Sequence, residues 1–477
     1  MVTDMVVAEY RIETELTERN LDLVPGFLKN NYVIQDRNYR QFRSFHIGKK
    51  TVTYRVAIPD SPAQVEVTVK LVSPIEVTMH TDGPTVNRKI LDELYEDLFL
   101  MVQLFEEETR RRNLYFAFMP GQRAIAENDR DSLRVRIFKD SMLPIYALLL
   151  ASTFLFFTLL GQYAPLAMVI ISLALALVSG RLISRSADWK ITKDHQEILL
   201  LQYTLSLFDI DQLGDGFTEH TARIRERLLE SSKRGLLPLS CESASAAFQE
   251  QGIACSSENM VVKNINVYRI VEKVAEDYRL PMPKIIVLNS VVPNAAAAGP
   301  SAKYGTMMVT TGLLAQLNED EVTSVIGHEM SHLRAHDPLV MSMMTNAEFI
   351  LRFYVVLPVI WTYGFAAFWA YFMVAMLSIY FFGKFLESRA DLDSVKALGS
   401  SKALADALRK IGFRKMFPLY KREPQFAGIR RLEWLQFDPH PPTYFRVAQL
   451  ESISEPGEIG NTFKKSLKDT LLGFLRA

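Results

Sequence analysis

Cysteine is almost absent from this chain of 477 residues. The two cysteines, Cys241 and Cys255, lie fourteen positions apart and form no CxxC pattern. A disulfide framework needs several cysteines, and a thiolate zinc site needs closely spaced ones. We therefore expect neither a disulfide framework nor a metal site with sulfur ligands.

Net charge is absent as well, because 54 basic residues balance 54 acidic residues. A protein that binds nucleic acid usually carries a basic excess, so this balance argues against a nucleic-acid partner. The N-terminal sequence lacks a basic segment followed by an apolar core. We expect no cleavable signal there.

Charged side chains are missing from residues 141 to 180, a stretch of 40 positions. The hydrocarbon core of a bilayer needs about 20 apolar residues per helix, so this length predicts two spans. The sequence GQYAP at residues 161 to 165 supplies the turn between them. By the positive-inside rule, basic residues on both sides place both flanks in the cytoplasm. These residues are Arg130, Arg134, Arg136 and Lys139 before the stretch, and Arg181, Arg185, Lys190 and Lys193 after it.

A second apolar region runs from residue 339 to residue 386, and its charged residues are Glu348, Arg352 and Lys384. Charges near the ends of a membrane helix are tolerated. The same composition also suits the core of a soluble domain. By itself, the region leaves both interpretations open.

Histidine is scarce, yet three of the 8 histidines fall in the stretch GHEMSHLRAHD. His328 and His332 are four residues apart, so on a helix they share one face about 6 Å apart and can bind one ion. His336 would lie roughly 12 Å from His328, whereas two nitrogens on one zinc lie within about 4 Å of each other. Glu329 completes the HExxH pattern, in which the glutamate acts as general base.

The residues around this motif predict a helix. Asn318 can cap its N-terminus, Glu321 is the matching capping-box partner, and Pro338 fits its end. An ordinary amphipathic helix with accidental histidines is the alternative. Its apolar face would consist of Val322, Val325, Ile326, Met330 and Leu333.

The HExxH pattern supplies two ligands, whereas a catalytic zinc usually has three protein ligands plus water. Glu387 and Asp391 stand four apart in FLESRADLDS, directly after the second apolar region, and would face the same way on a helix. Glu387 as third ligand, with Asp391 holding a ligand histidine, gives a His2Glu site. One membrane crossing would separate Glu387 from His328 by about 30 Å, so we expect a hairpin that turns near Tyr363 and Gly364. The alternative for ESRAD is a solvated helix start with an acidic pair.

From about residue 265 to residue 450, the sequence resembles the HtpX-like and CAAX prenyl protease family of membrane-embedded zinc metallopeptidases. The matching segments, in order, are LPMPKIIVLNSVVPNAAAAG, VTTGLLAQLNEDEVTSVIGHEMSHLRAHD, ESRAD and FDPHPPTYFR. The resemblance implies an α-helical multi-pass membrane protein. Its metallopeptidase domain is expected to be mainly helical, with an α+β zincin-like fold.

The resemblance also implies roles for the residues of these motifs. His328, His332 and Glu387 would bind one Zn²⁺ per chain. Glu329 would be the catalytic base, and Asp391 would support a ligand.

Two further parts of the site come from the resemblance. His440 and Arg446 in HPPTYFR match a late histidine and arginine that are thought to hold substrate and stabilise the oxyanion. The segment NAAAAG is implied to form an edge strand beside the zinc, along which a peptide adds its backbone as another strand. The family usually has a phenylalanine and a threonine in this segment, so no side-chain preference follows, and a loop of small residues is the alternative. The segment comprises Asn294, Ala295, Ala296, Ala297, Ala298 and Gly299.

The expected organisation has five parts. Residues 1–140 lie outside the resemblance and are predicted to form a soluble α+β domain of unknown role, with strands at TVTYRVAI and QVEVTVKLV and a helix near residues 86 to 112. The remaining parts are a transmembrane hairpin (141–180), the first part of the metallopeptidase domain (181–338), a second hairpin (339–386), and the second part of that domain (387–477).

These expectations together predict a membrane-bound zinc endopeptidase of protein quality control. Its partners would be peptide or protein substrates and the lipid bilayer, and its active site would face the cytoplasm from the cell membrane. A prenyl-peptide processing protease is one alternative, although four spans are few for it. A non-catalytic membrane scaffold with a structural zinc is another, although structural sites usually have four protein ligands. The sequence leaves the oligomeric state open.

Overall fold

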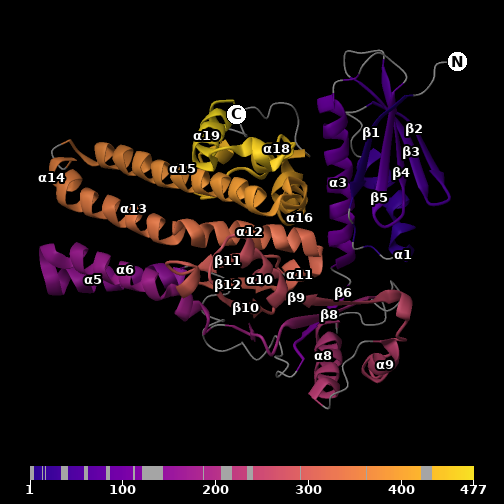
Figure 1. The fold of residues 1–477 in the computed structure, drawn as a ribbon, viewed down its shortest axis with the longest axis horizontal. Helices are drawn as coiled ribbons and strands as arrows, with labels where there is room; N and C mark the ends of the chain where they lie inside the picture. Colours follow the sequence, from indigo (N-terminus) through magenta and orange to yellow (C-terminus); the bar gives the residue numbers. More distant parts are fainter. Residues whose placement is uncertain are drawn as a thin grey trace. The chain divides into compact units, whose positions relative to one another are not determined.

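The computed structural model describes residues 5–12, 14, 16, 18–33, 41–58, 63–81, 86, 88–110, 113–120, 143–185, 187–205, 217–233, 240–290, 292–360, 363–420 and 432–476. The basic residues expected before the first hairpin, Arg130, Arg134, Arg136 and Lys139, lie outside these ranges. The chain divides into two compact units (Figure 1). The first comprises Met1–Phe116, Leu201–Val262 and Phe413–Pro424, and the second comprises Ala117–Leu200, Lys263–Gly412 and Gln425–Ala477.

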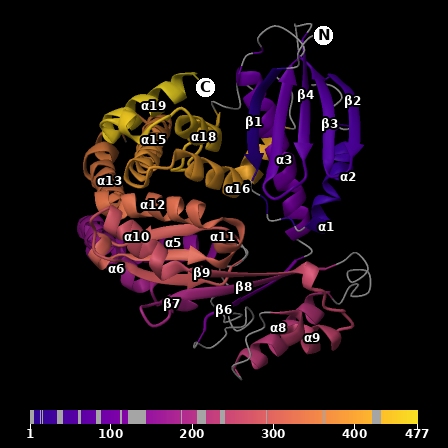
Figure 2. The same cartoon turned by 45° about the vertical axis from the view of Figure 1, so that its right-hand side comes forward.

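The first unit contains an antiparallel five-stranded sheet in the order β1-β5-β4-β3-β2. Val65, Val67 and Val69 alternate with more exposed residues along β4 and are buried, as a strand with one buried face requires. Helix α3 packs on this sheet and shares its apolar core (Figure 2). The predicted strand pair is confirmed as β3 and β4, and the predicted long helix as α3. The elements are β1 (Met5–Ile12), α1 (Glu18–Leu21), α2 (Val24–Leu28), the π-helix η1 (Lys29–Val33), β2 (Gln41–Gly48), β3 (Thr51–Ala57), β4 (Gln64–Lys70), β5 (Ile75–Thr81) and α3 (Arg88–Arg110).

A three-stranded sheet follows in the order β6-β8-β9, built from β6 (Asn113–Phe118), β8 (Glu197–Thr204) and β9 (Met260–Asn266). Between β8 and β9, the described residues form the helices α8 (Phe217–Lys233) and α9 (Cys241–Gln249), followed by the short helix η5 (Ser257–Asn259).

The two cysteines are joined, which differs from the expectation that they form no disulfide framework. Cys241 begins α9, and the chain turns back after this helix at Gly252, whose φ is +78°. The Cα atoms of Cys241 and Cys255 are thereby brought to 5.5 Å, and the residues form a single disulfide. Spacing along the sequence gave no sign of this turn.

The second unit contains a four-stranded sheet in the order β11-β12-β10-β7. Strands β10 and β12 are parallel, whereas the edge strands β11 and β7 are antiparallel to their neighbours. The strands are β7 (Trp189–Ile191), β10 (Lys284–Leu288), β11 (Ala295–Ala298) and β12 (Thr306–Thr310), and the nearby helices are α10 (Val267–Asp277), η6 (Ala302–Tyr304) and α11 (Thr311–Gln316).

Helix α12 (Glu319–Ala335) carries the HExxH motif. Both bonds of the predicted capping box are present, because the Asn318 side chain accepts from the Glu321 N–H and the Glu321 carboxylate accepts from the Asn318 N–H, each at 2.9 Å. The helix ends at His336, whose φ of +60° is left-handed. Pro338 then lies in the first turn of α13 (Asp337–Leu351).

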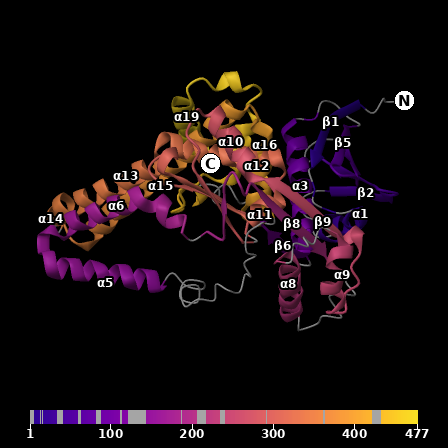
Figure 3. The same cartoon turned by 60° about the horizontal axis from the view of Figure 1, so that its bottom comes forward.

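Long apolar helices extend from this unit. By length and composition, three helical stretches in the described part could cross a membrane: Ala151–Ile183, Asp337–Val359 and Phe365–Leu398. The first is interrupted by η3 (Gly161–Tyr163), at which α5 (Leu143–Leu160) turns back into α6 (Ala164–Ile183), as Figure 3 shows. The other two form a second pair, in which α13 continues through the π-helix η7 (Arg352–Val356) and α14 (Leu357–Ile360) before α15 (Phe365–Leu398) returns.

The C-terminal end of α6 is packed directly against the sheet. A Cβ on Gly180 would lie 2.7 Å from the carbonyl oxygen of Tyr304 and 3.0 Å from that of Ala298, so no larger residue fits there. The Thr306 hydroxyl donates a 2.7 Å hydrogen bond to the Gly180 carbonyl oxygen. The C-terminal end of α6 is therefore in direct contact with the sheet at edge strand β11.

Helix α15 runs without interruption from the apolar region through ESRAD. Gly364 and Gly399 adopt positive φ at its two ends. The boundary expected between residues 386 and 387 therefore falls inside one helix. The remaining elements are α16 (Ser401–Tyr420), α18 (Thr443–Glu451), η9 (Pro456–Ile459) and α19 (Thr462–Arg476).

A buried ion pair joins α12 to α16 and offers a test of this packing. Glu321 and Lys410 are 2% and 4% exposed and lie 2.8 Å apart. Burial raises the pKa of the Glu321 carboxyl, and Lys410 opposes that effect. We expect Lys410→Met to lower the free energy of unfolding by about 3 to 5 kcal/mol, because it leaves a buried carboxylate unpaired.

The matched control is the double variant Glu321→Gln/Lys410→Met, which removes both charges and should recover most of the lost thermal stability. Thermal unfolding of the three purified proteins in detergent measures this. Equal destabilisation by the single and double variants would show that the ion pair is not the cause.

Candidate metal centre

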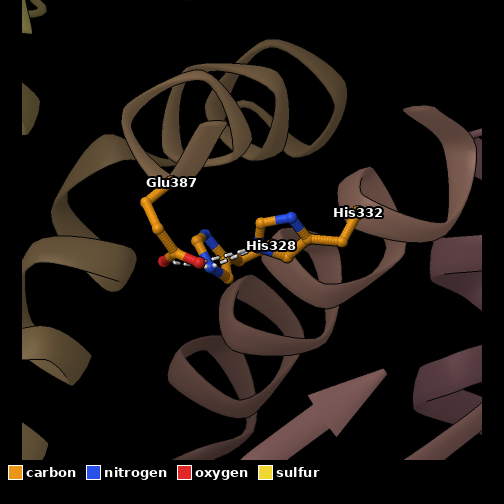
Figure 4. Close-up of side chains that lie close together, drawn as sticks. All are labelled: His328, His332 and Glu387. Atoms are coloured by element: carbon orange, nitrogen blue, oxygen red, sulfur yellow. Dashed lines mark hydrogen bonds and ion pairs between the residues drawn. The ribbon is translucent and has the colours of Figure 1, made fainter. Parts of the chain in front are cut away.

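Helices α12 and α15 bring three possible metal ligands together (Figure 4). His328 and His332 come from consecutive turns of α12, and Glu387 comes from α15. The Nε2 atoms of the two histidines are 3.2 Å apart. Each Nε2 atom lies 3.3 Å from a carboxylate oxygen of Glu387, His328 from Oε2 and His332 from Oε1.

This triangle fits a zinc ion. Two donor atoms at about 2.0 to 2.2 Å from one tetrahedral zinc are about 3.3 to 3.6 Å apart. The nearest donor-to-donor distances, 3.2, 3.3 and 3.3 Å, are close to that spacing, with each histidine facing its own oxygen of the Glu387 carboxylate. Oε2 of Glu387 is buried and has no hydrogen-bond partner among the described residues. Coordination of a metal ion by this oxygen would explain why. Two imidazoles and one carboxylate are a donor set typical of catalytic zinc, which keeps a fourth position open.

Asp391 supports the first histidine, one turn along α15 from Glu387. Its Oδ1 lies 2.9 Å from Nδ1 of His328, and the carboxylate is fully buried. Arg446 from α18 in turn holds Asp391 through two hydrogen bonds, from Nε at 2.8 Å and from Nη2 at 2.7 Å. A metal-binding histidine is usually oriented by such a partner on its other ring nitrogen.

The second histidine has an equivalent partner that sequence reasoning missed. Oδ2 of Asp337 lies 2.7 Å from Nδ1 of His332, and Arg389 from α15 donates to the same oxygen. The motif HExxHxxxxD contains the signal, because Asp337 lies one turn beyond His332. The left-handed His336 between the helices redirects Asp337 toward the ring, which periodicity alone does not predict.

Glu329 lies between the ligands and the edge strand. Burial raises the pKa of its carboxyl, while the two histidines and a backbone hydrogen bond from Ala297 oppose that effect. Ala297 belongs to β11, which pairs with β12 along one side. The Glu329 carboxylate therefore lies near both metal-binding histidines and the edge strand, where it is well placed for proton transfer at a bound peptide.

His440 and Arg446 differ in how they approach the site. His440 is half exposed, with Nε2 3.8 Å from Oε2 of Glu387 and Nδ1 2.8 Å from Oδ1 of Asp438. Lys384, which is fully buried, donates to the carbonyl oxygens of Gln436 and Asp438 and so fixes this loop. Arg446 is buried, and its Nη1 lies 3.6 Å from Glu387, so it contacts the carboxylates rather than open space.

His336 stays outside the ligand group, as helix geometry predicts. Its Nδ1 lies 2.6 Å from the carbonyl oxygen of Pro300, just beyond the edge strand.

Comparisons with known proteins agree on one family. The model of peptidase family M48 matches residues 262–454. A protease HtpX homolog of Pyrococcus furiosus is 30% identical over 215 residues, which cover 39% of this chain and 73% of that protein. A protease HtpX homolog of Thermococcus sibiricus is 31% identical over 218 residues, covering 40% of this chain and 74% of that protein.

Among solved structures, the crystal structure of S. mikatae Ste24p is similar over 38% of this chain and 49% of that chain, with 17% identity and a TM-score of 0.30. This likeness is too slight to support an inference. The matches to the HtpX homologues, at 30% and 31% identity over about three quarters of each relative, establish the family. The chain therefore belongs to peptidase family M48, as an HtpX-like membrane metallopeptidase.

Proposed function

We propose that the protein is a zinc-dependent endopeptidase that cleaves membrane or misfolded proteins at the cytoplasmic face of the cell membrane. The observation that carries this proposal is the triangle of His328, His332 and Glu387, with Glu329 between it and edge strand β11. A structural zinc would need neither an open coordination position nor an adjacent base. The scaffold alternative therefore has less support.

The chain's own residues account for the steps of hydrolysis. His328, His332 and Glu387 would hold zinc, which when bound supplies a Lewis acid that polarises a peptide carbonyl and acidifies water. Glu329 takes the proton of the attacking water and then passes it to the leaving amine. His440, half exposed beside Glu387, is available to stabilise the developing oxyanion.

Arg446 has a different role in this proposal from the one that the resemblance implies. Two of its nitrogens are engaged by Asp391, and the third faces Glu387. We propose that it orients these carboxylates, and through Asp391 also His328, instead of contacting the oxyanion.

The substrate would bind as an added strand on β11. Among the described strands, β11 pairs only with β12, so the rest of its other edge, beside the Ala297 N–H that donates to Glu329, is available to a peptide. The side chains of Ala295, Ala296, Ala297 and Ala298 are small, which suits recognition of backbone over sequence. An unfolded or locally extended substrate meets this requirement.

The proposed topology has two hairpins, at residues 141–180 and 339–386. From Gly161 to Gly180 there are 19 helical residues, or about 28 Å, close to the thickness of the hydrocarbon core. Because Gly180 packs on β11, the edge strand would lie at the membrane surface. Substrates would then be cytoplasmic segments of membrane proteins or chains delivered to that surface.

The experiment that tests the function uses purified protein in detergent and an unfolded test protein such as reduced casein. We expect cleavage that a chelator abolishes and that added zinc restores. Cleavage that persists after complete zinc removal would contradict the proposal.

The base can be tested separately from the metal. Glu329→Gln should retain stoichiometric zinc but lower hydrolysis by at least about 100-fold, because the amide cannot accept the proton. Zinc analysis and single-turnover cleavage measure the two properties. Near-normal cleavage by the fully metallated variant would rule out this role.

The ligand assignment predicts opposite results for two nearby residues. Glu387→Ala should lose zinc, because it removes one of the three protein ligands. His336→Ala should keep stoichiometric zinc and lose about 1 to 2 kcal/mol of stability at most, because only its bond to Pro300 disappears. Zinc content of both folded variants decides the matter, and the reverse pattern would refute the assignment.

The topology predicts which exposed positions react with an impermeant thiol reagent in intact cells. In a background of Cys241→Ser and Cys255→Ser, Gln162→Cys and Tyr363→Cys at the two turns should be labelled from outside. Glu276→Cys, which is exposed on α10, should be labelled only after the membrane is permeabilised. External labelling of Glu276→Cys in intact cells would overturn the two-hairpin arrangement.

A further inference from the structure

Helix α19 presents an apolar ridge that is largely exposed in the described structure. Four residues of α19 spaced four apart, Phe463, Leu467, Leu471 and Leu475, are between 41% and 68% exposed. The face next to Phe463 is packed, with Ser466 and Thr470 fully buried. Exposed apolar rows of this kind mark interaction surfaces. We call these four residues the α19 ridge.

Basic side chains border the α19 ridge on one side. Lys464 and Lys468 are exposed; projected around a helix at 100° per residue, Lys464 falls between Leu471 and Leu475, and Lys468 falls just beyond Leu475. Arg476 is also exposed, at the end of the helix. The acidic residue of the helix, Asp469, lies on the far side and is held by Lys465 at 3.0 Å and by Gln449. The charges next to the ridge, on Lys464 and Lys468, are therefore positive, whereas Arg476 projects to the same side as Asp469.

The α19 ridge adjoins the apolar part of α15. Phe463 packs on Phe385 with ring centroids 4.9 Å apart, and Phe474 packs on Phe381 at 5.8 Å. Figure 1 shows α19 lying along α15, on the side away from α13.

The depth of this contact can be estimated from α15 itself. Its turn is at Gly364, and Phe381 and Phe385 lie 17 and 21 residues further, or about 25 and 31 Å along the helix. The hydrocarbon core of a bilayer is about 30 Å thick. If the turn lies at one surface, α19 contacts α15 where the opposite surface of the hydrocarbon core falls.

A second exposed apolar segment lies next to α19. Leu432, Leu435 and Phe437 are 60%, 42% and 49% exposed, and Phe437 packs on Tyr380 of α15 at 5.5 Å. Trp434 in the same segment packs on Phe474 of α19 at 6.2 Å. Two neighbouring elements therefore expose apolar side chains at the same level of α15.

We propose that α19 is an interfacial helix that docks on the surface of an anionic bilayer, with its ridge among the acyl chains and its lysines at the lipid headgroups. An amphipathic helix with a basic polar face binds membranes in this way. Basic residues near an anionic surface add attraction that salt screens. Continuity with α15 favours a bilayer over a protein partner, because the hydrocarbon begins where the ridge meets that helix. Docking would hold α15, and with it Glu387, at a fixed depth.

The test uses full-length protein in nanodiscs, in a background of Cys241→Ser and Cys255→Ser. An environment-sensitive fluorophore is attached at Leu471→Cys on the ridge, or at Glu458→Cys as matched control, an exposed position on η9. We expect brominated acyl chains to quench the probe at 471 and leave the probe at 458 unaffected. Iodide in the water should quench the probe at 471 at least about threefold less than the probe at 458.

A second comparison tests the lysines. In nanodiscs with anionic lipid, Lys464→Gln/Lys468→Gln should reduce bromine quenching at 471 by roughly twofold, and phosphatidylcholine alone should have a similar effect on the unsubstituted helix. A probe at 471 that iodide quenches as strongly as the probe at 458 would overturn the proposal. Protection from iodide without bromine quenching would also overturn it, because that pattern indicates a protein contact. These outcomes do not depend on whether the chain cleaves peptides.

Discussion

The close packing of α12 against α15 is the constraint on which the site depends. Gly327 allows it, because a Cβ there would lie 2.4 Å from Cδ1 of Leu398 and 2.7 Å from Oγ of Ser394. The Ser394 hydroxyl donates to the carbonyl oxygen of Ser324, and the Ser331 hydroxyl donates to Asp393. These contacts fix the spacing at which one carboxylate of α15 meets two imidazoles of α12.

The two histidines are oriented by parallel arrangements of an acid and an arginine. Asp391 and Arg446 serve His328, while Asp337 and Arg389 serve His332. Each buried carboxylate is thus shared between a ring nitrogen and a guanidinium. Because Arg446 comes from α18, the geometry of the site also depends on a helix that supplies no ligand, while Arg389 comes from the same helix as Glu387.

Local signals in the sequence predicted the parts of the site that lie on one helix. Spacing placed His328 and His332 on one face and excluded His336, and capping residues gave the start of α12 correctly. Some contacts between elements could not be predicted from the sequence. The disulfide depends on a turn at Gly252, and the partner of His332 depends on the left-handed residue between α12 and α13. Neither backbone conformation leaves a periodic pattern. The sequence placed Glu387 and Asp391 on a helix, but the change from apolar to charged residues does not show that this helix is continuous with the apolar one, as it is in α15.

The central claim is that His328, His332 and Glu387 hold one zinc ion. X-ray absorption spectroscopy at the zinc K-edge tests this claim most directly. The proposed site predicts a shell of nitrogen and oxygen atoms at about 2.0 to 2.2 Å, with the outer scattering of two imidazoles. The Glu387→Ala protein, loaded with excess zinc, should lose one oxygen of this shell or fail to bind. A sulfur shell at about 2.3 Å, or a spectrum without imidazole scattering, would contradict the account.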